Sequence, residues 1–467
     1  MSDQETFLHA VSAAIQKNIA EDARLINCQQ LSAGASQETY RVQYQTDSGE
    51  ATVALRRAQP TAGEDSSVGG MGLELEAEVI RCAHSHSIPT PRVLYTLQPE
   101  DNLGRGFFMQ WLEGETLGQR IVAAPELEAT RKTLARSCGE ILGKIHAIEW
   151  QGTALEKELP VVDPAQLVEE TYQAYLALDI PVPVIDYSWR WLNENLPTQS
   201  RTTLVHGDFR NGNLMVVPEG INAVLDWELA HIGDPLRDLG WLCVNSWRFG
   251  NSELAVGGFG VVDEMLAGYR QTSGVSVAKE ALKFWQVFGS FWWAMVTLQM
   301  ANSWRSGETP SLERPVIGRR SSEAQMDCVN LLFPGQFELP QDNTLARAGT
   351  QLPMPEELLS GVIQFLKHEA APKLEGHNHF LARVAANSLR IAQSELRHGA
   401  AAGEAERQRL SAIVEDGGSL DELRWKLVHQ LRGDMPLDST QLQHHLRQTV
   451  AVQLFIDQPR YSALKQP

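Results

Sequence analysis

The spacing of apolar and polar residues changes along the chain and predicts a region of strands followed by a region of helices. Apolar and polar positions alternate over residues 24–57 around two turns, which predicts an antiparallel meander. Helical spacing occurs over residues 1–25, 73–87 and 127–148, and the short apolar run at 106–114 predicts a further strand. The pattern therefore indicates a small lobe rich in strands, followed by a larger helical lobe.

Helical spacing continues beyond this point with two interruptions. Residues 203–227 carry apolar runs that are typical of strands, and residues 340–352 are polar and aperiodic, which predicts a linker. The remaining residues, 353–467, have helical spacing throughout. The most apolar stretch, at 284–301, is interrupted by glutamine, serine and threonine, so we interpret it as a buried core helix rather than a membrane span.

Composition narrows the classes of protein. With 467 residues the chain is too long for one compact core, and its 43% hydrophobic and 21% charged residues are typical of globular proteins. The net charge of −18, most of which lies before residue 340, disfavours binding to nucleic acids or anionic membranes. The five cysteines lack disulfide or metal-binding spacing, and the N-terminus lacks an export pattern, so we expect a cytoplasmic protein.

The most informative segment joins two apolar runs that end in acidic residues or amides. Asp208 and Asn213 lie five residues apart in a loop that follows a short strand, and Asp226 ends the next apolar run. A Pro-Glu-Gly turn at 218–220 between the runs predicts a hairpin that brings Asn213 and Asp226 together. An amide and a carboxylate oxygen suit Mg²⁺ bound to nucleotide phosphates, and Asp208 could then accept the proton of an attacking hydroxyl. The alternative is that these residues are ordinary turn formers.

The motifs HGDFRNGNLM at 206–215 and DWE at 226–228 resemble those of the aminoglycoside phosphotransferase and choline kinase group, small-molecule relatives of protein kinases. The resemblance covers about residues 20–335. It implies an α+β, protein-kinase-like, two-lobed fold that uses ATP and Mg²⁺. It also implies that Asp208 is the catalytic base, that Asn213 and Asp226 are catalytic metal ligands, and that His206 supports the loop.

Upstream segments resemble the nucleotide-binding parts of the same family. Residues 31–40 resemble its nucleotide loop, in which Gly34, Ala35 and Ser36 would let backbone amides approach the phosphates. Arg56 occupies the place of the phosphate-binding lysine, with Arg57 as the alternative.

The partner of this arginine and the adenine site are predicted from the neighbouring elements. Glu76 is the expected carboxylate partner, and Glu74 and Glu78 compete for that role. Residues 108–114 resemble the hinge, where Gln110 and Leu112 would bind the nucleotide.

Downstream, residues 233–240 resemble the family's next turn and helix start. We interpret Asp234 and Asp238 there as residues that cap the helix and fix the loop, rather than as catalysts.

The resemblance also divides the chain and suggests a substrate. It places the two lobes at 1–107 and 108–339, the linker at 340–352 and an all-helical domain at 353–467. The leucine-arginine-arginine strand, DWE and GDPLRDLGW are similar to kinase domains fused to acyl-CoA dehydrogenases, which implies in-line phosphorylation of a 4-hydroxyacyl-CoA in acid catabolism. The C-terminal helices resemble a small domain of poorly defined function.

Two alternatives remain open. The first is a kinase for another small alcohol, such as an aminoglycoside, choline or a sugar, because acidic residues attract cationic substrates. The second is a catalytically silent scaffold that only binds nucleotide. The C-terminal helices could recognise substrate, form a lid or make a homodimer, and no sequence feature chooses among these roles.

Overall fold

The computed structural model describes residues 3–33, 37–58, 71–198, 201–341 and 354–465. These residues form two compact units, each of which combines segments from distant parts of the chain. The first contains residues 1–163, 199–243 and 247–282, and the second contains 164–198, 244–246 and 283–467. Of the predicted linker at 340–352, residues 342–352 lie outside the described residues.

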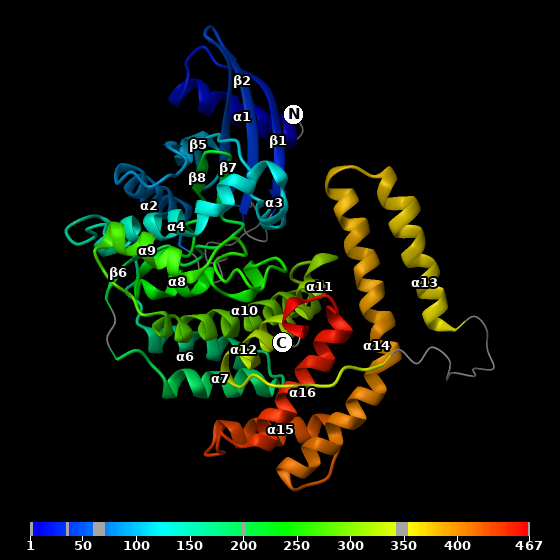
Figure 1. Ribbon diagram of the computed structural model, residues 1–467. Helices are drawn as coiled ribbons and strands as arrows, with labels where there is room; N and C mark the ends of the chain where they lie inside the picture. Colours follow the sequence, from blue (N-terminus) through cyan, green and yellow to red (C-terminus); the bar gives the residue numbers. More distant parts are fainter. Residues whose placement is uncertain (1–2, 34–36, 59–70, 199–200, 342–353, 466–467) are drawn as a thin grey trace. The chain divides into compact units, whose positions relative to one another are not determined.

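The first unit begins with a five-stranded antiparallel sheet in the order β1-β2-β3-β5-β4 (Figure 1). The strands span β1 (Arg24–Ala33), β2 (Gln37–Thr46), β3 (Gly49–Ala58), β4 (Val93–Thr96) and β5 (Gly106–Gln110). The predicted meander is thus confirmed, because β1, β2 and β3 pair in sequence order.

Two helices cover opposite faces of this sheet because neighbouring side chains of a strand alternate between its faces. Helix α1 (Asp3–Asn18) packs its buried residues into the cluster that contains Phe108. Helix α2 (Leu73–Ser85) packs into the cluster that contains Phe107. Consecutive phenylalanines of β5 therefore anchor one helix on each face, and both rings are fully buried.

The rest of the first unit is mainly helical and carries two short strand pairs. Strand β6 (Thr203–Val205) pairs with β9 (His231–Gly233), and β7 (Leu214–Val217) pairs with β8 (Gly220–Val224). The helices span α3 (Gly118–Ala123), α4 (Glu128–Ile145), α5 (Leu155–Glu158), α8 (Leu236–Leu242) and α9 (Val262–Ser273).

Glycine allows α4 and α9 to pack closely. A Cβ atom at Gly139 of α4 would collide with the backbone of Met265, and one at Gly268 of α9 would collide with the backbone of Arg136. A larger residue at either position would therefore force the helices apart.

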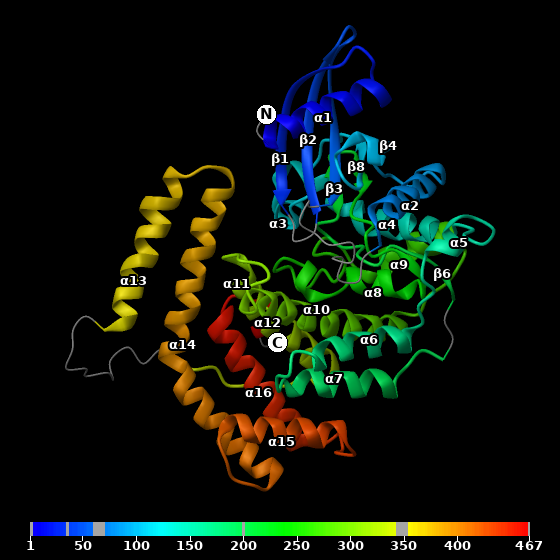
Figure 2. The same cartoon turned by 180° about the vertical axis from the view of Figure 1, so that it is seen from behind.

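The second unit is helical throughout. It contains α6 (Pro164–Leu176), α7 (Pro183–Glu194), α10 (Leu282–Arg305), α11 (Glu313–Arg319), α12 (Ser321–Leu332), α13 (Pro355–Phe365), α14 (Gly376–Val414), α15 (Leu420–Arg432) and α16 (Thr440–Asp457). Figures 1 and 2 both show α16 beside α12. Many α10 residues are buried, as expected for a core helix, and within the described ranges no helix is long and apolar enough to cross a membrane.

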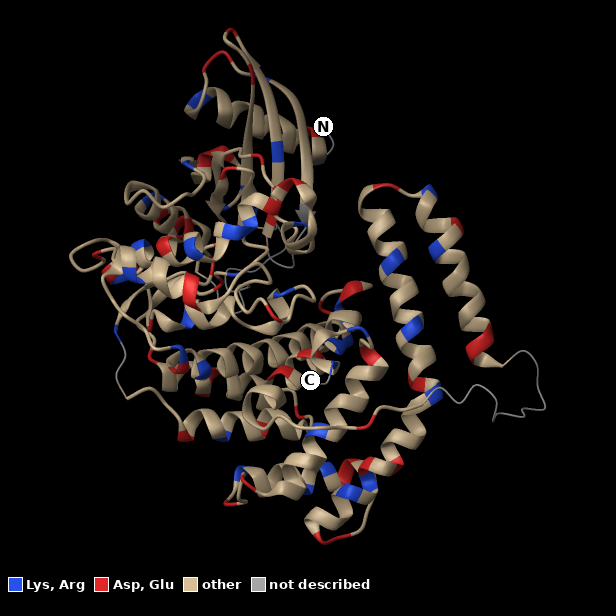
Figure 3. Ribbon diagram, in the orientation of Figure 1, with Lys and Arg blue, Asp and Glu red and all other residues tan. Residues whose placement is uncertain are grey.

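In this unit, helices from the middle of the sequence form polar contacts with residues near the C-terminus. Arg432 of α15 donates to Asp186 of α7 over 2.7 Å, and the hydroxyl of Tyr461 donates to Asp327 of α12 over 2.7 Å. Figure 3 shows acidic and basic residues close together where α14 meets α15, and Arg424 pairs there with Glu406 at 2.6 Å. The C-terminal part of the chain is therefore joined to α7 by an ion pair with a buried carboxylate and to α12 by a hydrogen bond.

Candidate active site

The loop at 206–213 between β6 and β7 is held by one carboxylate from α8. Asp238 accepts the backbone N–H groups of His206 (2.8 Å) and Gly207 (2.9 Å), and it also contacts Nε2 of His146 at 3.1 Å. Gly207 has a φ of +82°, and a Cβ atom there would collide with the carbonyl of Leu229, so only glycine fits. Asp238 thus fixes the loop, as predicted.

His206 links this loop to the chain before Asp226. Its Nδ1 accepts the backbone N–H of Asp208 over 3.1 Å, so its Nε2 carries the proton and donates to the carbonyl of Leu225 over 3.1 Å. Burial lowers the pKa of His206, which favours this neutral form. The predicted supporting role of His206 is therefore confirmed.

Asp208 is 9% exposed, and three side chains donate to its carboxylate in the described structure. Asn213 donates to Oδ2 over 2.6 Å, and the indole of Trp241 donates to Oδ1 over 2.7 Å. The Nε–H of Arg210 lies between both oxygens, at 3.0 and 3.2 Å. These bonds fix the direction of the carboxylate.

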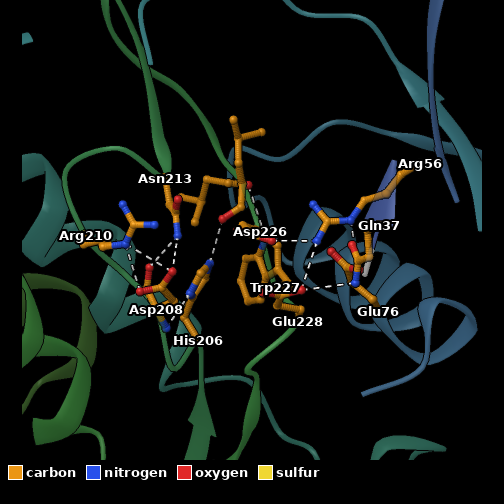
Figure 4. A network of polar contacts seen from close by, with 12 residues as sticks. Gln37, Arg56, Glu76, His206, Asp208, Arg210, Asn213, Asp226, Trp227 and Glu228 are labelled. Carbon is orange, nitrogen blue, oxygen red and sulfur yellow. Dashed lines mark hydrogen bonds and ion pairs between the residues drawn. The ribbon is translucent and has the colours of Figure 1, made fainter. Parts of the chain in front are cut away.

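The hairpin of β7 and β8 brings Asn213 and Asp226 together, as predicted. Leu214 pairs with Val224, and the N–H of Leu225 donates to the carbonyl of Asn213 over 2.8 Å. Asp226 follows directly with a φ of +64°, a left-handed conformation, and its carboxylate meets the guanidinium of Arg56 (Figure 4).

The oxygens of this pair fit a magnesium ion. The amide nitrogen of Asn213 is engaged by Asp208, which leaves its amide oxygen as the available ligand, and Asp226 supplies a carboxylate. Within the described ranges no group of three or more histidine, cysteine or acidic side chains forms a metal cage. Two protein oxygens would leave the other coordination positions to phosphates and water, which Mg²⁺ prefers.

Arg56 extends from β3 into a group of three carboxylates (Figure 4). Its Nη2 donates to Asp226 over 2.6 Å and lies 3.5 Å from Glu228, while its Nε lies 3.3 Å from Glu76. Gln37 of β2 donates to the same Glu228 over 3.1 Å. The guanidinium thus connects the strand lobe to the predicted metal ligand Asp226.

The pKa values of the three carboxylates depend on two opposing effects: burial, which raises them, and the positive charge of Arg56, which lowers them. Burial raises the pKa of Glu76 to about 7 although Arg56 opposes the shift. Burial and the charge of Asp226 raise the pKa of Glu228 to about 7. For Asp226, burial acts in the same direction, but the ion pair and hydrogen bond with Arg56 outweigh it and lower its pKa. Asp226 therefore keeps its negative charge to lower pH than Glu76 and Glu228 do.

The sequence left Arg56 and Arg57 as alternatives for the position of the phosphate-binding lysine, and the structure places them on opposite faces of β3. Arg57 points to the other face of β3, where it pairs with Glu38 at 2.9 Å and lies over the ring of Phe7.

The competing glutamates of α2 have partners of their own. Glu74 pairs with Arg105 at 2.6 Å, and Glu78 pairs with Arg81 at 3.0 Å. Glu76 is 1% exposed and is the one that meets Arg56.

The structure leaves the other predicted binding residues as predictions. Gln110 ends β5 and is exposed, and Leu112 is half-buried just beyond it, so the hinge assignment stays a prediction. Gly34, Ala35 and Ser36 lie outside the described residues. Asp234 accepts the N–H of Leu236 at the start of α8 over 2.8 Å, which is the predicted capping contact.

Sequence reasoning missed three side chains that contact the predicted site residues: Arg210, Glu228 and Trp241. Arg210 and Glu228 lie two residues after Asp208 and Asp226, respectively. Their position within the two motifs could therefore have identified them as site residues. Trp241 lies 33 residues from Asp208, and the sequence gives no direct sign of that contact.

Removing the arginine is expected to strengthen metal binding. Arg56→Met deletes the cation that neutralises Asp226 and leaves three carboxylates close together, so we expect Mn²⁺ to bind about tenfold tighter without nucleotide. Titration followed by electron paramagnetic resonance measures the affinity. Arg105→Met, which removes an exposed ion pair with Glu74, is the matched control and should leave it unchanged. Equal or weaker Mn²⁺ binding in Arg56→Met would show that Arg56 does not compete with the metal ion for Asp226.

Comparison with known families matches two parts of the chain. A model described as the phosphotransferase enzyme family matches residues 27–275, which include the sites of Arg56, Asp208 and Asp226. A second model, described as a domain of unknown function, matches residues 372–461.

Two curated relatives carry the name acyl-CoA dehydrogenase family. Member 10 from Mus musculus is 33% identical over 178 residues, covering 37% of this chain and 16% of that protein. Member 11 from Homo sapiens is 24% identical over 383 residues, covering 76% of this chain and 46% of that protein. This chain therefore spans less than half the length of these relatives.

A solved structure shares the fold. A Ralstonia eutropha protein assigned as an aminoglycoside phosphotransferase superposes with a TM-score of 0.55 at 21% identity, covering 68% of this chain and 96% of that chain. The expected kinase-like fold, with its antiparallel sheet lobe and helical lobe, is confirmed.

Proposed function

The chain belongs to the phosphotransferase enzyme family, and from this membership we propose that it transfers the γ-phosphoryl group of MgATP to a hydroxyl of a small molecule. The observation that carries the proposal is the convergence of Asp208, Asn213, Asp226 and Arg56 on one site of the first unit. A base, two oxygen ligands and a cation are the groups that phosphoryl transfer requires.

Each residue has a defined part in the proposed reaction. Asp208 accepts the proton of the acceptor hydroxyl as its oxygen attacks the γ-phosphorus in line, and the β–γ bridging oxygen leaves with ADP. Asn213 and Asp226 would hold magnesium, which when bound offsets the negative charge of the phosphates. Arg56, held by Glu76, adds a second positive charge beside the phosphates.

The acceptor that we favour is the hydroxyl of a 4-hydroxyacyl-CoA. Support comes from the relatives, which are named acyl-CoA dehydrogenase family members. The resemblance of the leucine-arginine-arginine strand, DWE and GDPLRDLGW to kinase domains fused to such dehydrogenases points the same way.

A panel of acceptors tests the proposal. The protein is incubated with MgATP and 4-hydroxyvaleryl-CoA, and the phosphorylated thioester is detected by mass spectrometry. Valeryl-CoA, which lacks only the hydroxyl, is the matched control and should give no product. Free 4-hydroxyvalerate tests whether the CoA part is needed.

The same panel separates the other candidates. The net charge of −18 favours a cationic acceptor, so choline and an aminoglycoside are included, and their turnover would replace the thioester as substrate. ATP binding without transfer to any acceptor or to water would indicate a silent scaffold.

A further inference from the structure

Trp241 comes from a different structural element than the other two side chains that donate to Asp208. Arg210 and Asn213 belong to the same loop as Asp208, whereas Trp241 belongs to α8, which begins 28 residues after it. The indole N–H donates to Oδ1 of Asp208 over 2.7 Å, and Trp241 is only 4% exposed. An indole can only donate, so the direction of this bond is unambiguous.

Helix α8 holds both the backbone and the carboxylate of the loop. Asp238 and Trp241 lie three residues apart and therefore share a face of the helix. Asp238 accepts the backbone N–H groups of His206 and Gly207, while Trp241 donates to the side chain of Asp208. One buried element thus fixes where the loop runs and also how its carboxylate is turned.

A second indole stabilises this arrangement. The rings of Trp241 and Trp247 meet edge to face, with centroids 5.0 Å apart and an angle of 73°. The guanidinium carbon of Arg210 lies 4.5 Å from the centre of the Trp247 ring. Two of the three donors to Asp208 are therefore packed against the same ring, which limits the rotation of both.

The three donors leave the carboxylate with little spare capacity. A carboxylate has about four acceptor positions, and each oxygen of Asp208 already has two donors, because the Nε–H of Arg210 is shared between the oxygen that binds Trp241 and the oxygen that binds Asn213. The shared contact of Arg210 is the longest of these, so an acceptor hydroxyl can replace it at one oxygen while the shorter bonds from Trp241 and Asn213 keep the carboxylate in place.

We propose that Trp241 is a positioning residue for this reaction: its indole N–H fixes the rotamer of Asp208 so that the carboxylate faces the acceptor hydroxyl. The inference rests on the proposed function, in which Asp208 receives the proton. Trp241 itself touches neither ATP nor acceptor in this assignment and acts through Asp208.

Trp241→Phe tests the bond while keeping an aromatic ring against Trp247. We expect kcat to fall about 10- to 100-fold, because misplacement of a reacting group by even about 1 Å has effects of this size. The KM for MgATP should stay within about twofold. Trp285→Phe is the matched control: Trp285 is buried in α10, its indole N–H has no acceptor within the described residues, and wild-type kcat is expected.

A double-substitution cycle separates positioning from general damage. In an Asp208→Asn background, measured in single turnovers with enzyme in excess, adding Trp241→Phe should change the rate less than about twofold. An unchanged kcat in Trp241→Phe alone would overturn the proposal. So would an equal loss in both backgrounds, because the effect would then not pass through Asp208.

A magnetic resonance measurement makes the inference independent of turnover. The indole ¹⁵N–¹H signal of Trp241, assigned by its disappearance in Trp241→Phe, should shift in Asp208→Asn, whereas the signal of Trp285 should not. If the wild type transfers no phosphoryl group even to water, the proposed function fails, and this signal still decides whether the bond exists. A Trp241 signal that does not respond to Asp208→Asn overturns the inference, whatever the activity.

Discussion

Asp208→Asn is expected to lower kcat for phosphoryl transfer by about 10²- to 10⁴-fold, the contribution typical of a positioned general base. The amide is nearly the same size as the carboxylate, but it cannot accept the proton of the acceptor hydroxyl. It also places an N–H₂ group among the donors Asn213 and Trp241, so at least one of their hydrogen bonds is lost.

Nucleotide binding separates this effect from loss of the fold. The affinity for MgATP, measured by calorimetry, should change by less than about threefold, because Arg56 and the magnesium ligands are untouched. Asp101→Asn is the matched control: Asp101 is another buried carboxylate, bonded to Tyr95 and Gln98 in the sheet lobe, and its kcat should equal that of the wild type. Wild-type turnover in Asp208→Asn would refute the assignment of the base.

The parts of the site that local patterns determine could be predicted from the sequence. The Pro-Glu-Gly turn between two apolar runs sets the hairpin, and the pairing of Leu214 with Val224 follows from it. Asn213 and Asp226 flank this pair, so their proximity follows from register alone. The strand at His231–Gly233 was not predicted, because three residues carry almost no periodicity and its partner β6 lies far away in the sequence.

The sequence alone could not decide which of several neighbouring charged residues enters the site, because that depends on how the elements pack. Alternation along β3 places Arg56 and Arg57 on opposite faces, but it cannot tell which face meets Asp226. Helical spacing likewise places Glu74 and Glu78 on one side of α2 and Glu76 on the other. The burial of Leu73, Ala77 and Ile80 decides that Glu76 faces inward.

The contact between Trp241 and Asp208 could not be predicted from any local pattern. Trp241 meets Asp208 because β9 pairs with β6 and so brings the start of α8 beneath the loop. No spacing rule connects positions 33 residues apart through such a pairing. Residues that support a catalytic group from another element are therefore the part of a site that a single sequence hides most effectively.

Arg432→Leu is expected to destabilise the second unit by about 3–5 kcal/mol, the usual cost of leaving one partner of a buried ion pair without the other. Asp186 is fully buried, and its carboxylate accepts from the Nε–H of Arg432 and from the hydroxyls of Tyr172 and Tyr175. Without the guanidinium, two neutral hydroxyls remain to stabilise the buried charge. Urea unfolding followed by circular dichroism measures the loss.

The pH dependence of this loss has a defined sign. Burial already raises the pKa of Asp186, although Arg432 and the two tyrosines oppose the shift, so the folded pKa rises further when Arg432 is absent. A raised folded pKa means that stability is retained at low pH and is lost as pH rises through that value. The difference between the variant and the wild type should therefore be small near pH 4 and should grow toward pH 8.

Two further variants show whether the buried charge is the cause. Asp186→Leu combined with Arg432→Leu removes both charges and should recover much of the lost stability, because well-packed apolar residues can replace a buried pair. Arg407→Leu removes an exposed ion pair with Glu404 on α14 and should leave the midpoint of unfolding almost unchanged. A double variant as unstable as Arg432→Leu would show that lost packing of the arginine side chain, rather than the uncompensated carboxylate of Asp186, limits the stability of this unit.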